Sequence, residues 1–296
     1  MKIAIAGASG LVGSALIPIL QSDGNQITRL VRSSPKAGEI EWHPNQDEVS
    51  TQSLQGFDVI INLAGENIAG GRWTDEQKRK IRDSRVNGTH LLSEAIAKMS
   101  SKPQAFICAS ATGIYGDRDD EVLNEQSESG GGFLAGVCRE WEKATEPANK
   151  AGVRVVNLRF GPILARDGGM LSKLLTPFKM GMGGKVGSGK QHISWIALDD
   201  AVSAIKLAID RQTIHGPLNV VSPNPVTNEE FTKTLGHVLN RPTALAMPAF
   251  AARLAFGEMA DEMLLASQKV MPKKLTSAGF QFQYPQLEAA MRKYVG

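Results

Sequence analysis

The segment Gly7-Ala8-Ser9-Gly10-Leu11-Val12-Gly13 decides how the first part of this chain folds. It follows a short apolar run over residues 2–6 and precedes a helical pattern over residues 11–21. Glycines spaced G-x-x-G-x-x-G between a strand and a helix predict a loop that binds the diphosphate of a dinucleotide, although Ala8 replaces a glycine of the commoner G-x-G-x-x-G pattern. The start of the helix offers N–H donors and a favourable dipole to an anion. The candidate ligands of the diphosphate are Gly7, Ser9, Gly10, Leu11, Val12 and Gly13. A tight turn without a ligand is the alternative.

Outward from this loop, short apolar runs alternate with longer helical patterns, which is typical of a parallel sheet covered on both faces. The predicted strands cover residues 2–6, 26–31, 58–63, 105–109, 154–159 and 218–221. The predicted helices cover residues 11–21, 75–98, 133–151 and 199–210. The pattern predicts an α/β, Rossmann-type, doubly wound parallel sheet.

The second half of the chain differs in composition. Residues 180–189 are too rich in glycine for a regular element and predict a functional loop or lid. From Val226 onward the pattern is mainly helical. We therefore expect a Rossmann domain over residues 1–165, to which 196–222 return, and a smaller, mainly helical substrate lobe from 166–195 and 223–296.

The end of the second predicted strand favours NADP(H) over NAD(H). Enzymes that use NAD place an acid about 20 residues after the glycine loop, where it binds a ribose hydroxyl. Here no carboxylate lies between Asp23 and Glu39, and the strand ends in Arg32-Ser33-Ser34 with Lys36 beyond. A guanidinium and hydroxyl groups suit the 2′-phosphate of NADP. An ordinary exposed surface charge is the alternative for Arg32.

Composition excludes several other classes of protein. The net charge is only +3, and the basic residues around Lys78 and Arg82 alternate with apolar ones, so we expect no nucleic-acid partner. The only cysteines, Cys108 and Cys138, lack the spacing of a metal site or disulfide framework. The N-terminal apolar run is too short for a signal peptide, and no stretch could span a bilayer. We expect a cytoplasmic protein with a small-molecule substrate, no metal and no membrane partner; its oligomeric state cannot be read from sequence.

Several further motifs together resemble one family. They are residues 62–68 (NLAGENI), 84–89 (SRVNGT), 110–116 (SATGIYG), 158–164 (LRFGPIL), 194–196 (SWI), 256–259 (FGEM) and 272–275 (PKKL). With the glycine loop, they resemble the extended and atypical short-chain dehydrogenases/reductases, and more narrowly the nucleoside-diphosphate-sugar epimerase-like proteins. The resemblance covers the whole chain.

The resemblance implies further cofactor-binding residues. Leu63 and Ala64 would line the cofactor, and Arg85 would reach it from the long helix, although Arg85 could equally be a solvated helix charge. The segment from Gly161 would flank the nicotinamide. The remaining residues implied in this way are Gly65, Glu66, Ser110 and Pro162, with a buried partner for a backbone donor as the alternative for Glu66.

The catalytic residues of that family are missing. Short-chain dehydrogenases use a Tyr, a Lys four residues later and a Ser or Thr, but no Y-x-x-x-K occurs here. Aligning the helix that begins at Phe133 puts Leu134 at the Tyr position and Cys138 at the Lys position, and Ala111 falls at the hydroxyl position. Tyr115 is the remaining candidate for proton transfer, with packing in the cofactor pocket as the alternative.

Other chemically capable side chains are assigned structural roles. Cys138 is expected to be a small buried apolar residue, because no neighbouring His or Lys would make it a thiolate. His192 is expected to form structural hydrogen bonds. Trp73, Phe178, Met180 and Met182 form either an apolar wall of the substrate site or core.

Two functions follow from the sequence. The first is an NADP(H)-dependent oxidoreductase or epimerase that acts on a carbonyl compound or sugar nucleotide with a non-standard active site. The second is a non-catalytic protein that binds or senses NADP(H), which the missing Tyr, Lys and Ser favour. Nucleic-acid binding on the same scaffold is disfavoured by the modest charge.

Overall fold

The structure is a computed structural model that describes residues 1–32, 35–44 and 48–295. Ser33 and Ser34, which the sequence analysis grouped with Arg32, lie outside the described residues.

A central sheet has the strand order β12-β8-β6-β5-β1-β2-β3-β4. The neighbouring pairs from β3 through β2, β1 and β5 to β6 are parallel, and the short β4 pairs antiparallel with β3. The strand bounds are β1 (Lys2–Ala6), β2 (Gln26–Val31), β3 (Glu39–His43), β4 (Glu48–Val49), β5 (Val59–Asn62), β6 (Ala105–Ala111), β8 (Arg154–Phe160) and β12 (Gly216–Val220). This order reverses direction at β1, as in a doubly wound Rossmann sheet, and confirms the predicted fold class.

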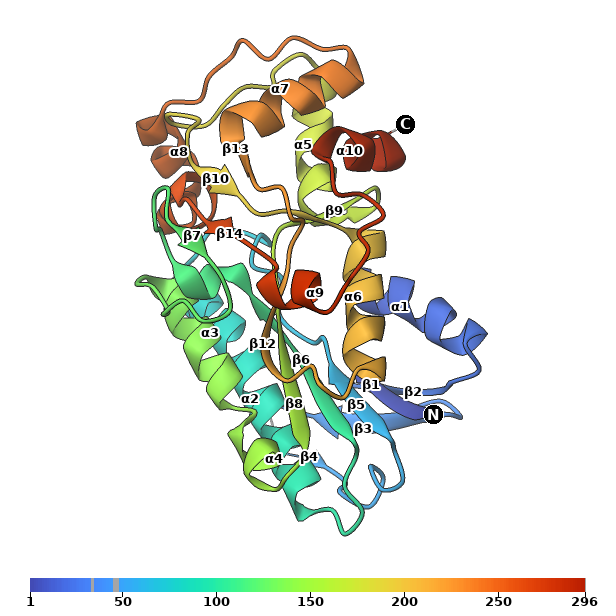
Figure 1. Cartoon of the computed structure of the whole chain (residues 1–296). Helices are drawn as coiled ribbons and strands as arrows, with labels where there is room; N and C mark the ends of the chain where they lie inside the picture. Colours follow the sequence, from blue (N-terminus) through green and yellow to red (C-terminus); the bar gives the residue numbers. More distant parts are fainter. Residues whose placement is uncertain (33–34, 45–47, 296) are drawn as a thin grey trace. The chain divides into compact units, whose positions relative to one another are not determined.

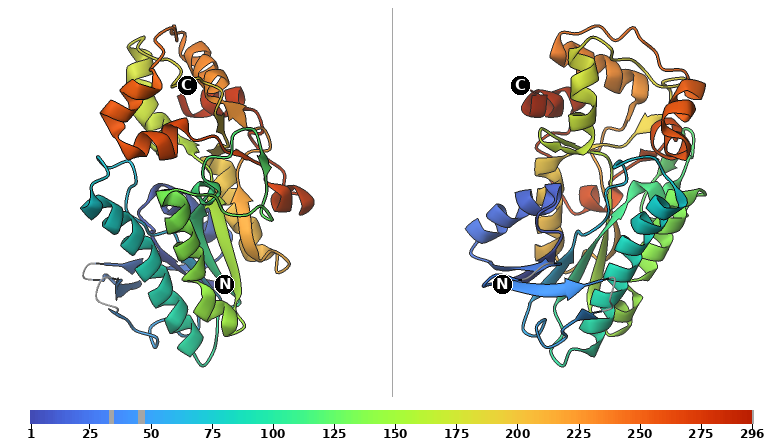
Figure 2. Two further views of the ribbon diagram at one scale, coloured as in Figure 1. Left: turned by 90° about the vertical axis from the view of Figure 1, so that its left-hand side faces the viewer. Right: turned by 180° about the vertical axis from the view of Figure 1, so that it is seen from behind.

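Helices cover both faces of this sheet. In Figures 1 and 2, α1 (Leu11–Ser22) and α6 (Leu198–Asp210) lie on one face, and α2 (Asp75–Lys98) and α4 (Glu146–Lys150) lie on the other. The strands between them carry fully buried side chains, such as those of Ile60 and Ile61 on β5. Burial on both faces explains why β1, β5 and β6 are almost entirely apolar in sequence.

The chain divides into two compact units. The first unit comprises residues 1–110, 137–158 and 202–218, and the second comprises 111–136, 159–201 and 219–296. Residues 111–136 thus belong to the second unit, although the sequence analysis placed them in the first domain; the predicted domain ranges stay a prediction.

The second unit is mainly helical, with short two-stranded pairs. Its core contains Trp195, Phe231 and Tyr294. Its elements are η1 (Thr112–Tyr115), β7 (Val122–Leu123), β9 (Ile163–Ala165), α5 (Gly169–Lys179), β10 (His192–Ile193), β11 (Ile196–Ala197), β13 (Val226–Thr227), α7 (Asn228–Leu239), α8 (Ala249–Phe256), η2 (Ala260–Leu265), β14 (Lys269–Val270), α9 (Lys273–Ser277) and α10 (Leu287–Val295).

Most of the predicted elements are found with bounds that differ by one or two residues. The strand over 26–31 and the helix over 75–98 are found with the predicted bounds. The predicted helix over 133–151 is wrong: α3 (Phe133–Lys143) ends before Ala144, and α4 starts at Glu146. Pro147 has no N–H for helical pairing and restricts the residue before it, and the Thr145 hydroxyl donates to the Glu142 carbonyl oxygen.

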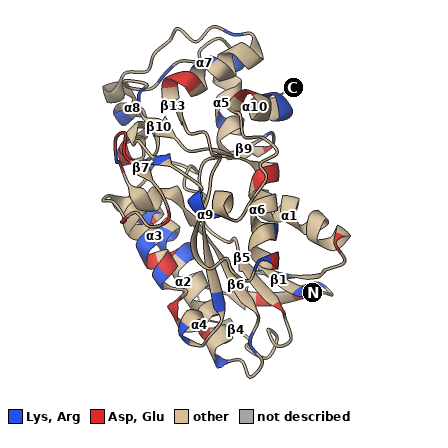
Figure 3. Ribbon diagram, in the orientation of Figure 1, with Lys and Arg blue, Asp and Glu red and all other residues tan. Residues whose placement is uncertain are grey.

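Basic and acidic side chains alternate along the surface helices. Figure 3 shows Lys and Arg beside Asp and Glu on α2 and α3, where Arg82 pairs with Asp83 and Glu140. In the described part of the chain, no helix has the length and apolar character needed to cross a membrane.

Candidate functional site

The glycine loop joins β1 to α1 in the first unit. Gly10 is the N-cap residue of α1 and has no side chain to accept hydrogen bonds from the first turn. Ser9 and Gly10 are exposed, and Leu11 and Val12 are half-buried. The first amide groups of α1 are thus available to an external acceptor at the positive end of the helix dipole.

Two of the three glycines are required by close backbone approaches. Gly7 has a φ of +78°, and a Cβ there would lie 2.5 Å from the Leu63 carbonyl carbon. A Cβ at Gly13 would lie 2.4 Å from the Gly7 carbonyl oxygen. A Cβ at Gly10 would meet only the Gly7 carbonyl oxygen, at 3.3 Å. Gly7 and Gly13 therefore let the loop pack against β5 and α1, whereas the space beside Gly10 is mostly open.

Arg32 directly follows the carboxyl end of β2, the strand next to β1 in the sheet. Its side chain is exposed. Arg32 therefore lies at the same sheet edge as the glycine loop, because the carboxyl ends of parallel strands share one edge.

The segment after β5 is held in place by α2. The amide of Glu66 donates to the Ser84 hydroxyl (3.0 Å), and the Arg85 guanidinium donates to the carbonyl oxygens of Glu66 and Ile81 (2.9 Å each). The guanidinium also lies over the Trp141 ring, 5.1 Å from its centroid. Burial lowers the pKa of Arg85. Arg85 is therefore bound to the protein itself and fixes the path of the loop.

Leu63 and Ala64 continue β5, where the Ala64 amide donates to the Asn62 side-chain oxygen (3.1 Å). Gly65 packs against Arg85: a Cβ there would lie 3.3 Å from the guanidinium carbon. The chain from Leu63 to Glu66 is thus a fixed loop at the same sheet edge as Gly7.

Ser110, near the carboxyl end of β6, is buried, and its hydroxyl donates to the Glu142 carboxylate at 2.7 Å. This bond occupies the hydroxyl hydrogen.

In the second unit, Gly161 is buried, and a Cβ there would lie 1.8 Å from the Ser194 carbonyl oxygen. Pro162 is exposed, and its carbonyl oxygen accepts from the Ile196 amide (3.0 Å).

Tyr115 is fully buried in the second unit, with 0% of its surface exposed. Its hydroxyl lies 2.7 Å from the Asn219 side-chain oxygen and 3.0 Å from the Asn124 carbonyl oxygen, and it accepts from Arg159 at 2.9 Å. Burial raises the pKa of Tyr115, and Arg159 only partly offsets this. In this structure the phenol has no exposed surface, which favours the packing role for Tyr115; its assignment to proton transfer stays a prediction.

We call the buried hydrogen-bonded group around Tyr115 the Tyr115 cluster; it extends through Asn219 to Glu125. One carboxylate oxygen of Glu125 accepts from the amides of Asn219 (3.1 Å) and Lys274 (3.2 Å). The Asn219 side chain donates to the Met271 carbonyl oxygen (3.0 Å). Sequence reasoning missed these partners. The one sequence feature that could have indicated a buried polar cluster here is Arg159, a charged residue within the apolar run of β8.

The start of α3 carries the positions where the catalytic Tyr and Lys were expected. Glu262, on η2, accepts from the amides of Phe133 (2.9 Å) and Leu134 (3.0 Å). Gly132 has a φ of +97°, and any Cβ there would collide with the Glu262 carboxylate. Cys138 is buried, as expected. A carboxylate from 128 residues away thus caps this helix, and nothing in the local sequence predicts it.

The remaining candidates differ in how far they are buried. Both cysteines are free, and burial raises the pKa of Cys108 to about 12, which keeps this thiol neutral. Phe178 is buried in the core of the second unit, whereas Met180 and Met182 are exposed. Trp73 is half-buried and donates to the Ile68 carbonyl oxygen (2.8 Å).

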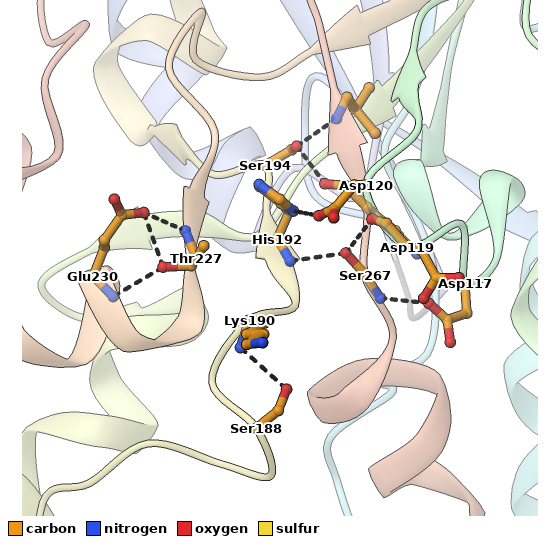
Figure 4. Close-up of polar contacts among 12 residues, drawn as sticks. Asp117, Asp119, Asp120, Ser188, Lys190, His192, Ser194, Thr227, Glu230 and Ser267 are labelled. Atoms are coloured by element: carbon orange, nitrogen blue, oxygen red, sulfur yellow. Dashed lines mark hydrogen bonds and ion pairs between the residues drawn. The ribbon is translucent and has the colours of Figure 1, made fainter.

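His192 lies in a network of the second unit (Figure 4). Its amide donates to the Ser267 hydroxyl (3.0 Å), and its ring nitrogen Nδ1 lies 3.4 Å from Asp120 without hydrogen-bond geometry. Burial, followed by Lys269, lowers the pKa of the imidazole. Only the amide of His192 is hydrogen-bonded here, and Nδ1 has no hydrogen-bond partner among the described residues, so the structural hydrogen bonds expected of this side chain stay a prediction.

Comparison with known proteins agrees with this geometry. The NAD dependent epimerase/dehydratase family matches residues 3–221, and a domain of unknown function (DUF1731) matches residues 247–294. The epimerase family protein ML0860 of Mycobacterium leprae is 44% identical over 290 residues, which are 98% of this chain and 94% of that protein.

Two solved structures are also similar. Human epimerase family protein SDR39U1 (isoform 2), crystallised with NADPH, has a TM-score of 0.92 and 31% identity, and the match covers 99% of each chain. UDP-N-acetylglucosamine 4-epimerase from Bacillus cereus has a TM-score of 0.77 over 99% of this chain and 98% of its own, but at 17% identity it shows the fold alone. By sequence and by structure, this chain belongs to the NAD dependent epimerase/dehydratase family.

Proposed function

We propose that this protein binds NADP(H) and uses it in an oxidoreductase or epimerase reaction. The observation that carries the proposal is the open first turn of α1, where Gly10 provides no cap and Gly7 and Gly13 bring the backbone close. The similar human protein SDR39U1 was crystallised with NADPH, which supports the choice of cofactor.

The proposed contacts follow from the placement of each residue. The amides of Leu11, Val12 and Gly13 and the Ser9 hydroxyl would hold the diphosphate, as helix starts do in other dinucleotide sites. Arg32 would bind the 2′-phosphate through a charge-assisted bond. Leu63 to Glu66, fixed by Arg85, would line the cofactor beside Gly7, and Ser110, Gly161 and Pro162 are proposed at its nicotinamide end.

A thermal-shift titration that compares NADPH with NADH tests this proposal. A ligand at 100 times its dissociation constant stabilises the native state by about 2.7 kcal/mol, which is a readily measured shift. We expect NADPH to bind more tightly than NADH, and Arg32→Ala to weaken NADPH about tenfold or more while NADH is unchanged.

Arg29→Ala is the matched control, because Arg29 is also an exposed arginine but lies within β2, two residues before its end. It should change neither affinity. A tighter response to NADH in the unaltered protein, or an equal loss in both variants, would contradict the role of Arg32.

A non-catalytic protein that binds or senses NADP(H) is the second candidate. It is favoured by the burial of Tyr115, by the bond that occupies Ser110, and by Leu134 and Cys138 at the Tyr and Lys positions. Stereospecifically labelled NADPH with candidate carbonyl compounds and sugar nucleotides separates the two. Label transfer to any of them establishes an enzyme, and retention of label with all of them favours the second candidate. The oxidoreductase class and a cytoplasmic location stay predictions.

A further inference from the structure

The segment 63–66 follows β5 in the first unit, and we call it the β5 loop. Side chains hold it at two points. The Asn62 side-chain oxygen accepts from the Ala64 amide (3.1 Å). At the far end of the loop, Arg85 of α2 donates to the Glu66 carbonyl oxygen (2.9 Å). The path of the β5 loop therefore depends on how the Asn62 and Arg85 side chains are themselves held.

The β5 loop also touches the glycine loop. A Cβ at Gly7 would lie 2.5 Å from the Leu63 carbonyl carbon and 2.7 Å from the Ala64 amide nitrogen. The same Ala64 amide is bound by Asn62. A shift of the β5 loop would therefore change the contact with the loop that is proposed to hold the diphosphate.

A buried threonine on α2 fixes the orientation of Asn62. Thr89 is fully buried and Asn62 is 1% exposed, and the Asn62 side-chain nitrogen donates to the Thr89 hydroxyl oxygen at 2.9 Å. Because a backbone amide can only donate, the Asn62 oxygen must face Ala64, which leaves the nitrogen to face Thr89. The Thr89 hydroxyl therefore sets which way the Asn62 side chain is turned.

The indole of Trp141, on α3, supports both Thr89 and Arg85. Its Nε1 donates to the Thr89 hydroxyl oxygen (2.9 Å), and the Arg85 guanidinium lies over its ring. Arg85 and Thr89 are four residues apart and so share one face of α2. The Thr89 oxygen accepts two N–H groups, which leaves its hydrogen for the Cys108 sulfur, 3.6 Å away. All of these residues belong to the first unit.

We infer that Thr89 and Trp141 are positioning residues for the cofactor, because together they hold the β5 loop in place against Gly7. This inference rests on the proposed binding of NADP(H). A loop that already has its bound shape loses less conformational freedom when the ligand binds, so the ligand binds more tightly. Removal of the Thr89 hydroxyl should therefore weaken NADPH binding through Asn62 and Ala64.

Calorimetric titration of the full-length protein with NADPH, at a temperature where each variant is folded, tests the inference. Thr89→Val keeps the shape of the side chain but removes the acceptor of two buried N–H groups, and we expect about tenfold weaker binding. Thr89→Ser keeps the hydroxyl and should bind within about twofold of the unaltered protein. Trp141→Phe keeps an aromatic ring but removes the indole N–H, and we expect about threefold weaker binding.

Ser93→Ala is the matched control. Ser93 lies four residues after Thr89 on α2 and is also fully buried, and its hydroxyl accepts from the Ala148 amide of α4 (2.9 Å). The substitution removes a buried acceptor from the same face of the helix, but one that binds α4 and not Asn62. We expect Ser93→Ala to lower the melting temperature, while the NADPH affinity stays within about twofold.

Amide hydrogen exchange of the protein without NADPH reports on the β5 loop directly. Thr89→Val should speed exchange at Ala64, because the Asn62 side chain that accepts from this amide is no longer held by the hydroxyl. Thr89→Ser and Ser93→Ala should leave exchange at Ala64 unchanged.

Several outcomes would overturn the inference. Equal weakening in Thr89→Val and Ser93→Ala would give Thr89 a role in stability alone. Unchanged NADPH affinity in Thr89→Val, or in Trp141→Phe should Thr89→Val not fold, would remove both residues from cofactor binding. Weaker binding with unchanged exchange at Ala64 would exclude the route through the β5 loop. Absence of NADPH binding by the unaltered protein would contradict the proposed function itself, whereas equal binding by the unaltered protein and Thr89→Val contradicts only this inference.

Discussion

The glycine loop and the Tyr115 cluster both follow strands of the same kind, but they are built from different parts of the chain. The loop is seven consecutive residues whose shape depends on backbone atoms, and its near neighbour from elsewhere in the chain is the backbone of Leu63, directly after β5. The Tyr115 cluster joins side chains 44 and 104 residues apart, those of Arg159 and Asn219.

This difference shows which kind of site a sequence reveals. A backbone site is recorded in the local order of glycines, because only glycine permits the close approach. A site of buried side chains depends on partners that are distant in the sequence. The sequence therefore placed Tyr115 just after a strand but did not predict which residues surround its hydroxyl. The following predictions test this contrast, from the largest expected effect to the smallest.

Gly7→Ala should destabilise the protein by about 3 kcal/mol or more, because the new Cβ would collide with the backbone at Leu63. Gly24→Ala is the control: Gly24 has the same φ of +78°, but a Cβ there meets nothing within 4 Å, so only about 1 kcal/mol is expected. Urea unfolding of both variants measures the difference. Equal losses would show that φ alone, and not the approach to β5, requires glycine in the loop.

Tyr115→Phe should cost about 2 kcal/mol, because it removes the buried hydrogen bonds that join the Tyr115 hydroxyl to Arg159 and to the Asn219 side chain. The NADPH thermal shift should stay the same, since the cluster does not belong to the glycine loop. Urea unfolding measures the stability, and NADPH oxidation with any active substrate measures the chemistry. Should oxidation stop while stability is kept, Tyr115 would be catalytic after all.

Gly10→Ala should separate binding from folding within the loop. A Cβ at Gly10 is tolerated at 3.3 Å from the Gly7 carbonyl oxygen, so we expect a loss of stability below about 1 kcal/mol. The methyl group would crowd the first amides of α1, and NADPH should bind about tenfold more weakly, equal to about 1.4 kcal/mol. Unchanged NADPH affinity would remove the diphosphate from the start of α1.

The smallest predicted effect concerns His192, whose protonation should make the stability of the protein depend on pH. Its pKa is lowered in the folded state, so the unfolded chain binds the proton more tightly, and stability falls as the pH drops from 7.5 toward 5.5. The groups that face it are Asp120, Glu230 and Lys269. In His192→Gln, the melting temperature should change less with pH over this range. An unchanged slope would assign the pH dependence to another group.

The second unit shows where local sequence is insufficient. The helix over 133–151 was predicted from its periodicity, but Pro147 and the Thr145 side chain interrupt it. The short strand pairs β10 with β13 and β14 with β7 were not predicted, because each has only two residues and its partner is distant in the sequence.

By itself, the sequence determined the strand–loop–helix at Gly7 to Gly13, the α/β order and the bounds of β2 and α2, because these depend on local backbone geometry and on apolar periodicity. Only the tertiary structure decided that Tyr115 is buried against Arg159 and Asn219, that Arg85 binds the loop after β5, and that Glu262 caps α3. Those contacts join side chains whose neighbours are set by the packing of distant elements, and no local pattern of residues records that packing.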